Sequence, residues 1–202
     1  MRNLKNKKVA IYGGSFNPIH IGHLLTGLEV VEKLGYDYIL FIPDNIPVHK
    51  DFAGAAAAAD RLNMVALAVK GIKRFFVSDV EIRRGGKSFT IDTVLELKKK
   101  ISEDEKFGII FGADLVHTLP SWKGIEQLQE YADFICLKRG NEKIPDSIYK
   151  LHHLENRTID VSSTEIRKRI SGNMPIDYMV TENVKKYIMK NNLYRNEACH
   201  RI

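Results

Sequence analysis

The sequence predicts one α/β domain built on a doubly wound, mostly parallel sheet of about six strands. Short apolar runs bounded by turn residues alternate with segments whose apolar residues recur at helical spacing. The first apolar run is followed by a glycine pair and then by a helical pattern, and a strand, helix, strand succession implies a right-handed parallel pair. At 202 residues, 44% of them hydrophobic, the chain is long enough for one well-buried domain and short for two.

Apolar runs predict strands at residues 9–12, 38–43, 75–82, 107–111 and 134–139. The run at 107–111 is the most apolar and is expected at the centre of the sheet. Helical spacing predicts helices at 24–34, 61–69, 91–100, 124–131 and 181–190, with another beginning near Ser162. Residues 143–156 lack a period and are expected to be irregular. The domain is assigned to 1–194, and 195–202 is expected to be a disordered tail.

Composition indicates which kinds of ligand or partner the protein is expected to bind. The formal net charge of +6 indicates an anionic partner, either nucleotides or nucleic acid. The lysines are scattered without interleaved aromatic residues, which argues against nucleic acid. No apolar run approaches a membrane span and no secretory signal opens the chain, so a cytoplasmic protein without a membrane partner is expected. Cys136 and Cys199 offer neither a disulfide framework nor metal-ligand spacing, and Cys136 is expected to be a core residue.

The first predicted strand runs into a loop and helix start that carry two histidines. His20 and His23 are three residues apart, so their rings project from neighbouring positions on one helix face. The amides and positive dipole end of such a helix form an anion site, and Gly22 leaves the backbone open to a phosphate. One histidine here would more often be a capping residue. Two around a glycine, after a Gly-Gly turn, favour a functional site.

The strings Gly14-Ser15-Phe16-Asn17-Pro18 and His20-Ile21-Gly22-His23 resemble the motif of the nucleotidylyltransferase superfamily, which contains His-x-Gly-His. More narrowly, the chain resembles the bacterial nicotinate-nucleotide adenylyltransferases. The resemblance implies a Rossmann-like fold and transfer of the adenylyl group of ATP to nicotinate mononucleotide, giving nicotinate adenine dinucleotide and pyrophosphate in NAD biosynthesis. It also implies ATP contacts at four positions of the loop: Gly14, Ser15, Phe16 and Gly22.

A second matching segment is Pro47-Val48-His49-Lys50, after the second predicted strand. In the resembled family this loop ends Pro-Pro-His-Lys, and its lysine faces the phosphates of ATP. Val48 replaces the second proline, so the loop is expected to be less rigid. Without the flanking motif, Lys50 would be read as an exposed loop lysine. The alanine run at 55–59 has no functional interpretation.

The loop at 83–90 contains a partial match to a phosphate-binding motif. Gly86-Lys87-Ser88 looks like the end of a phosphate-binding P-loop, but Glu81 stands where that motif needs its first glycine. The segment is instead similar to one in the nicotinate-nucleotide enzymes whose Ser-Tyr-Thr holds the nicotinate carboxylate, largely through backbone amides. Ser88, Phe89 and Thr90 occupy those positions, with Phe89 in place of tyrosine. Thr90 also fits a plain helix cap.

Two further segments complete the resemblance. Gly112-Ala113-Asp114, followed by Leu119-Pro120-Ser121-Trp122, resembles a family segment whose aspartate lies at the nucleotide site and whose tryptophan stacks on the pyridine ring. Trp122 could equally be a packing anchor. The string at 161–167 matches the Ser-Ser-Thr-x-Ile-Arg motif of the superfamily. Ser162 and Glu165 also fit a capping box, while Ser162, Ser163, Thr164 and Arg167 would make a second anion site for ATP.

The predicted chemistry is direct in-line displacement without a covalent intermediate. His20, His23, Lys50 and Arg167 would act by positioning and charge stabilisation. Mg²⁺ would be held mainly by ATP oxygens, without protein metal ligands. Pantetheine-phosphate adenylyltransferases usually have threonine at position 20, and class I aminoacyl-tRNA synthetases are much larger and carry a Lys-Met-Ser-Lys-Ser loop absent here. The sequence leaves open whether the chain forms a homo-oligomer and how strongly it prefers the acid nucleotide.

Overall fold

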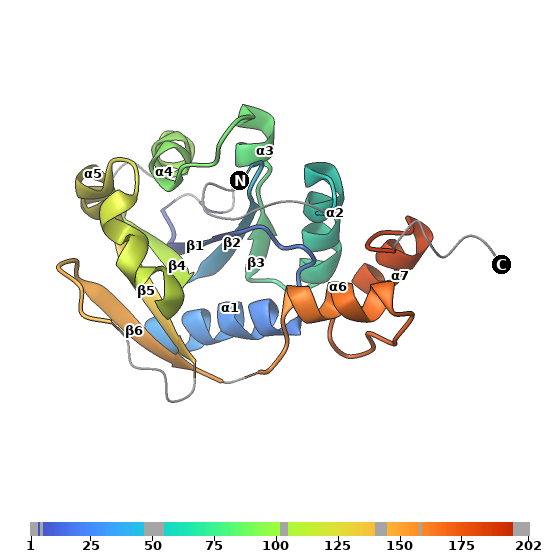
Figure 1. Ribbon diagram of the computed structural model, residues 1–202. Coiled ribbons are helices and arrows are strands. Elements are labelled where there is room, and N and C mark those ends of the chain that lie inside the picture. Colours follow the sequence, from blue (N-terminus) through green and yellow to red (C-terminus); the bar gives the residue numbers. More distant parts are fainter. Residues whose placement is uncertain are drawn as a thin grey trace.

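A computed structural model describes residues 4, 6–46, 55–101, 105–139, 145–157 and 159–195. Six strands form one sheet in the order β3-β2-β1-β4-β5-β6, and every neighbouring pair is parallel (Figure 1). The strands are β1 (Val9–Gly14), β2 (Tyr38–Pro43), β3 (Phe75–Val77), β4 (Phe107–Gly112), β5 (Ala132–Arg139) and β6 (Leu151–Asn156). The predicted doubly wound α/β fold is confirmed.

Helices cover both faces of the sheet. They are α1 (Ile21–Leu34), α2 (Ala58–Val69), α3 (Val80–Arg84), α4 (Thr90–Lys98), α5 (Ile125–Tyr131), α6 (Ser163–Ser171) and α7 (Glu182–Lys190), with a 3₁₀ segment η2 (Ala113–Ser121). One core cluster joins apolar residues of α1, α2, α6 and α7 to one sheet face, and the other joins α4 and α5 to the opposite face (Figure 1). Alternation along β1 explains the split, since Ala10 and Tyr12 belong to one cluster and Val9 and Ile11 to the other.

Two predictions of secondary structure were wrong. The strand expected at 75–82 ends at Val77, and Val80–Arg84 forms α3, which ends at Gly85 with a φ of 74°. Residues 151–156, expected to be irregular, form β6. This strand pairs with β5 at the sheet edge, and among its side chains with described burial only Leu154 is fully buried, so no apolar run marks it.

Three further expectations concern Cys136, membrane-spanning helices and the C-terminal residues. Cys136 is fully buried on β5, as predicted, and burial followed by the charge of Asp114 raises its thiol pKa to about 11. Within the described parts of the chain, no helix is long and apolar enough to cross a bilayer. Residues 196–202 of the predicted tail lie outside the described residues, so the division at 194 stays a prediction.

The sheet order identifies where a ligand would sit. β1 lies between β2 and β4, and the chain leaves β1 for β2 on one side and reaches β4 later on the other. In open α/β sheets this reversal opens a crevice at the carboxyl ends of the strands. The loop from β1 to α1, which carries both histidines, begins at that crevice.

Candidate active site

The two histidines open α1 and stack on each other. His20 is the N-cap residue of the helix and His23 is its third residue. Their ring centroids lie 3.7 Å apart at an interplanar angle of 32°. The backbone N–H of His20 donates to Nδ1 of His23 at 3.1 Å, so the proton of a neutral His23 ring resides on Nε2. The pair therefore presents an N–H donor close to the first amides of a helix.

Gly22 shapes the position of the His20 ring. An added Cβ at Gly22 would lie 3.0 Å from Cε1 and Nδ1 of that ring. The open backbone expected here for a phosphate is thus covered in part by the imidazole, which is buried with 8% of its residue surface exposed. Phe16 is also buried and packs its ring edge-on against His23 at 5.1 Å. Its side chain therefore supports the histidines from the core, and ligand contact is left to its backbone.

Three side chains from distant elements hold the loop between β1 and α1 through its carbonyl groups. Arg61 Nη1 donates to the carbonyl of Ser15 at 2.8 Å, and Arg167 Nη1 donates to that of Asn17 at 2.9 Å. Ser163 Oγ donates to the carbonyl of Pro18 at 2.8 Å. Because amides and hydroxyls at two helix starts and two guanidinium groups converge here, the loop is both rigid and positively polarised.

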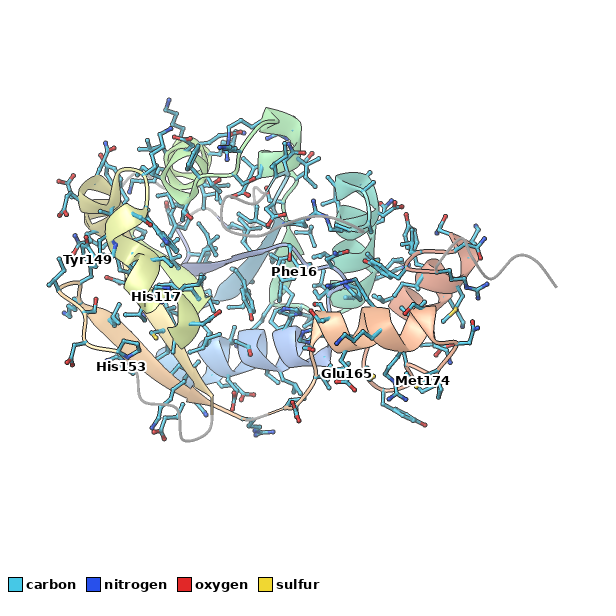
Figure 2. The ribbon with its side chains drawn as sticks, viewed as in Figure 1. Phe16, His117, Tyr149, His153, Glu165 and Met174 are labelled. Atoms are coloured by element: carbon cyan, nitrogen blue, oxygen red, sulfur yellow. The ribbon has the colours of Figure 1, made fainter. Side chains whose placement is uncertain are left out.

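The start of α6 adjoins this loop. Ser162 caps α6 by accepting the N–H of Glu165 at 3.1 Å, which is one of the two hydrogen bonds of the predicted capping box. Arg167 Nη2 donates to Thr164 Oγ1 at 3.3 Å, so its guanidinium spans the helix start and the loop. Other histidines lie apart: His117 on η2 and His153 on β6 are toward the β6 edge of the molecule, away from Phe16 (Figure 2).

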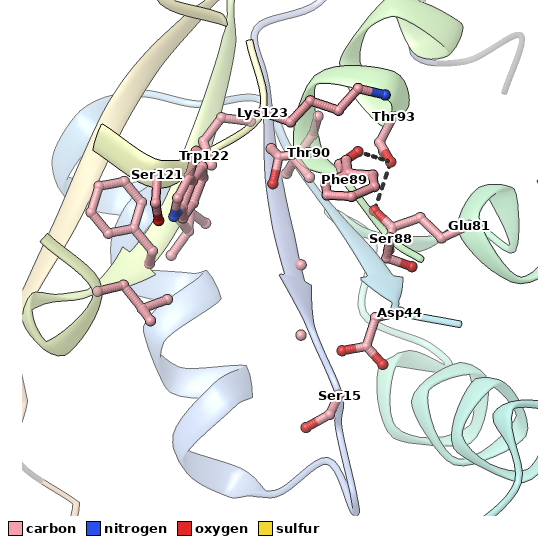
Figure 3. Close-up of a pocket in the computed structure, with 17 residues that line it drawn as sticks. Ser15, Asp44, Glu81, Ser88, Phe89, Thr90, Thr93, Ser121, Trp122 and Lys123 are labelled. Atoms are coloured by element: carbon pink, nitrogen blue, oxygen red, sulfur yellow. Dashed lines mark hydrogen bonds between the residues drawn. The ribbon is translucent and has the colours of Figure 1, made fainter. Parts of the chain in front are cut away.

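A cavity of about 230 Å³ lies at the carboxyl ends of β1 and β4 and shares Gly14 and Ser15 with the histidine loop. Ser88, Phe89, Thr90 and Trp122 all line it, so the structure brings together the four residues that the resemblance assigned to the nicotinate nucleotide. Figure 3 shows the Trp122 indole on one side and Ser88, Phe89 and Thr90 on the other. These residues come from β4–α5 and α3–α4 connections, which a parallel sheet delivers to one edge.

The walls of this cavity are held by their own hydrogen bonds. Trp122 Nε1 donates to Thr118 Oγ1 at 3.0 Å, which leaves the indole face toward the cavity. At the rim, Lys123 Nζ lies 2.9 Å from Asp92 Oδ2 and 4.9 Å from the centroid of the Phe89 ring. Phe89 is the N-cap residue of α4 and Thr90 its first helical residue, so the cap interpretation of Thr90 was wrong. The first amides of α4 therefore start beside the cavity.

The sequence interpretation missed two carboxylates in this cavity, Glu81 and Asp44. Burial raises the pKa of Glu81, while hydrogen bonds from Thr93 and Ser88 act in the opposite direction. Thr93 Oγ1 donates to Glu81 Oε1 at 2.6 Å (Figure 3). Glu81 falls within the strand predicted at 75–82. Its contact with Thr93 of α4 could be expected only if residues 80–84 were recognised as a helix.

Arg61 was also missed, although it is the largest fully buried side chain. Its Nη1 lies 2.8 Å from Asp44 Oδ1, and its Nη2 donates to the carbonyl of Asn45 at 3.1 Å. With the bond to Ser15, it joins the ends of β1 and β2 through one guanidinium. The available signal was an arginine on the apolar face of α2, three and four residues before Met64 and Val65.

A smaller hollow lies on the other side of β1, against the histidines. Its lining residues are Tyr12, His20, Gly22, His23, Thr26, Arg157, Ile159 and Val161. Glu29, itself buried, accepts the N–H of Arg157 at 2.9 Å and holds this segment over α1. The end of β1 thus has one hollow on each side, with the His20–His23 pair beside one and the Trp122 cavity on the other.

The remaining expected site residues are placed less centrally. Asp114 is exposed on η2 and is absent from the residues lining the larger cavity, although an added Cβ at Gly112 would collide with its carboxylate. Lys50 lies outside the described residues. Among the described residues, no three His, Cys, Asp or Glu side chains gather to hold a metal ion.

Comparison with known proteins agrees with this geometry. Residues 11–169 match the model of the cytidylyltransferase-like family. The chain is 38% identical to the nicotinate-nucleotide adenylyltransferase of Bacillus subtilis over 190 residues, covering 94% of this chain and 100% of that protein. It is 41% identical over 196 residues to a probable nicotinate-nucleotide adenylyltransferase of Halalkalibacterium halodurans, covering 95% and 94%.

A solved structure gives the same result in three dimensions. The fold superimposes with a TM-score of 0.72 on Plasmodium falciparum nicotinic acid mononucleotide adenylyltransferase complexed with NaAD. The two chains are 26% identical, and the match covers 94% of this chain and 98% of that one. The chain therefore belongs to the nicotinate-nucleotide adenylyltransferases, within the cytidylyltransferase-like family.

Proposed function

We propose that this protein transfers the adenylyl group of ATP to nicotinate mononucleotide, releasing pyrophosphate and forming nicotinate adenine dinucleotide. The main support for the proposal is that two parts of the site share Gly14 and Ser15. One is the histidine loop with its polarised helix starts, and the other is the cavity lined by Ser88, Phe89, Thr90 and Trp122. Family membership supports the same reaction.

In this reaction a phosphate oxygen of the acceptor attacks the α-phosphorus of ATP. The new P–O bond forms as the bond to the β-phosphate oxygen breaks, and pyrophosphate leaves with that electron pair. His23 would donate from Nε2 to the charge that develops on the α-phosphate, and the amides at the start of α1 would bind the same oxygens. His20 holds His23 by its backbone N–H and by ring stacking.

Arg167 and the start of α6 would bind the outer phosphates of ATP, together with Ser162, Ser163 and Thr164. The guanidinium already spans the helix start and the Asn17 carbonyl, so its charge is fixed beside the loop. Lys50 is proposed for the same phosphates on the resemblance alone. Mg²⁺ would be carried mainly by ATP oxygens and water, where it neutralises phosphate charge.

The larger cavity would take the pyridine ring of the acceptor. Trp122 would stack on the electron-poor ring, and amides near the start of α4 would donate to its carboxylate. A carboxylate accepts from several donors, whereas a carboxamide turns its NH₂ toward some of them. The acid nucleotide should therefore be preferred over the amide nucleotide. Such small soluble substrates also favour a cytoplasmic location without nucleic-acid or membrane partners.

The test is to incubate the protein with ATP and Mg²⁺ and measure pyrophosphate with each candidate acceptor: nicotinate mononucleotide, nicotinamide mononucleotide and phosphopantetheine. Release that depends on nicotinate mononucleotide and yields the dinucleotide supports the proposal. Release with phosphopantetheine alone, or no release with any acceptor from folded protein, contradicts it.

A further inference from the structure

The chain returns from its C-terminal helix to the active-site loop. After α7 ends at Lys190, a turn over residues 191–194 brings Tyr194 back toward the sheet. The phenol hydroxyl of Tyr194 donates to Oδ1 of Asn17 at 2.7 Å, across 177 positions of sequence. Asn17 lies three residues before His20, so Tyr194 binds the loop that positions the two histidines.

Asn17 is the point at which several segments meet. Its Oδ1 also accepts the backbone N–H of Ala56 at 3.1 Å, and its carbonyl accepts Arg167 Nη1 at 2.9 Å. Asn17 is buried, with 7% of its surface exposed. Loss of the Tyr194 hydroxyl would leave a buried amide oxygen with one donor fewer, which changes how firmly the side chain is held.

The backbone of Tyr194 is unusual for a bulky residue. Its φ is 64°, in the left-handed region that favours glycine. Such a conformation carries a cost and persists where surrounding contacts determine it. Burial raises the pKa of the Tyr194 phenol, and the nearby guanidinium groups of Arg167 and Arg61 oppose that rise. The hydroxyl and Arg167, which holds the loop, both bind Asn17.

We propose that Tyr194 is a positioning residue for adenylyl transfer, which acts through Asn17 on the loop that carries His20 and His23. This inference rests on the function proposed above. In this role the phenol would act through Asn17 and not on the reacting atoms directly. Its hydrogen bond orients the Asn17 side chain, and Asn17 in turn fixes the loop relative to Ala56 and to the start of α6.

The test is Tyr194→Phe, which removes one oxygen and keeps the ring. Tyr187→Phe is the matched control, because Tyr187 lies on α7 and both hydrogen-bond partners of its hydroxyl are side chains of α2: it donates to Asp60 at 2.8 Å and accepts from Asn63 at 2.9 Å. Both variants should lose similar, small amounts of thermal stability. Only Tyr194→Phe should lower kcat, by about tenfold, because small displacements of catalytic groups reduce turnover strongly. The KM for nicotinate mononucleotide should stay within about twofold of wild type, because the Trp122 cavity is untouched.

Hydrogen exchange gives a readout that does not depend on activity. The Ala56 amide, which bonds to Asn17, should exchange about fivefold faster in Tyr194→Phe than in wild type or Tyr187→Phe. Unchanged kcat and unchanged exchange in Tyr194→Phe, or equal loss of kcat in both variants, would overturn the inference. If wild type releases no pyrophosphate, the proposed function fails. The exchange data then still decide whether Tyr194 orders the loop.

Discussion

Gly22→Ala tests how the His20 ring is held. The Cβ of an alanine at this position would lie 3.0 Å from two atoms of the ring, a contact so tight that the neighbour must give by a few tenths of an ångström. The neighbour is the imidazole, which is stacked on His23 with centroids 3.7 Å apart. The substitution therefore shifts the histidine pair without removing any polar group.

The expected cost follows from the size of the shift. A misplacement of 1 Å near a reacting centre costs roughly 100-fold in rate, so a shift of about a third of that should lower kcat about fivefold. The fold should not suffer, because alanine is more favourable than glycine in a helix by about 0.5–1 kcal/mol. Gly22→Ala should therefore combine a lower kcat with an unchanged or raised unfolding temperature.

Gly27→Ala is the matched control on the same helix. Its Cβ would lie 3.1 Å from Cζ of Phe75 and 3.2 Å from Cζ of Phe41, so the nearest neighbours are core rings and not the imidazoles. Overpacking of this kind costs about 1–3 kcal/mol, so this variant should unfold at a lower temperature and keep its kcat. The assays are pyrophosphate release at saturating substrates and thermal unfolding. Wild-type kcat in Gly22→Ala, or equal loss of kcat in both variants, would refute the reasoning.

Four further predictions follow from the site. His23→Ala should lower kcat roughly 10²–10³-fold in folded protein because it removes a donor, and His20→Ala should lower kcat less because it removes only the ring stacked on His23; near-normal turnover in both would remove these rings from catalysis. Arg167→Ala should raise the KM for ATP and leave that for nicotinate mononucleotide unchanged; the reverse pattern would assign the guanidinium to the acceptor. Wild type should prefer the acid nucleotide at least about tenfold in kcat/KM, and Trp122→Ala should weaken both acceptors, so equal use of both by wild type would contradict the carboxylate pocket. Because burial raises the folded-state pKa of Glu81 above 4.5, stability linked to its proton is present at low pH and lost as pH rises above 4.5. Glu81→Gln should thus gain stability relative to wild type with rising pH, and a constant difference in unfolding temperature would count against this.

Local pattern was sufficient for much of the fold. The apolar runs at 38–43 and 107–111 predicted β2 and β4, because a strand buried on both faces needs a continuous apolar run. The same logic failed at 151–156, since an edge strand such as β6 has fewer apolar positions to mark it. It failed again at 80–82, where five residues form a helix too short to show a period.

By itself, the sequence determined the family, the order of most elements and the candidate residues within the motifs, because motifs such as His20-Ile21-Gly22-His23 are contiguous. Tertiary structure alone decided which residues share a site. Arg61 reaches Ser15, Arg167 reaches Asn17 and Tyr194 reaches Asn17 only because helices on one face of the sheet return to the end of β1. A buried polar group must find a partner, and no local pattern encodes which distant segment supplies it, since the packing of the sheet and its helices brings the two together.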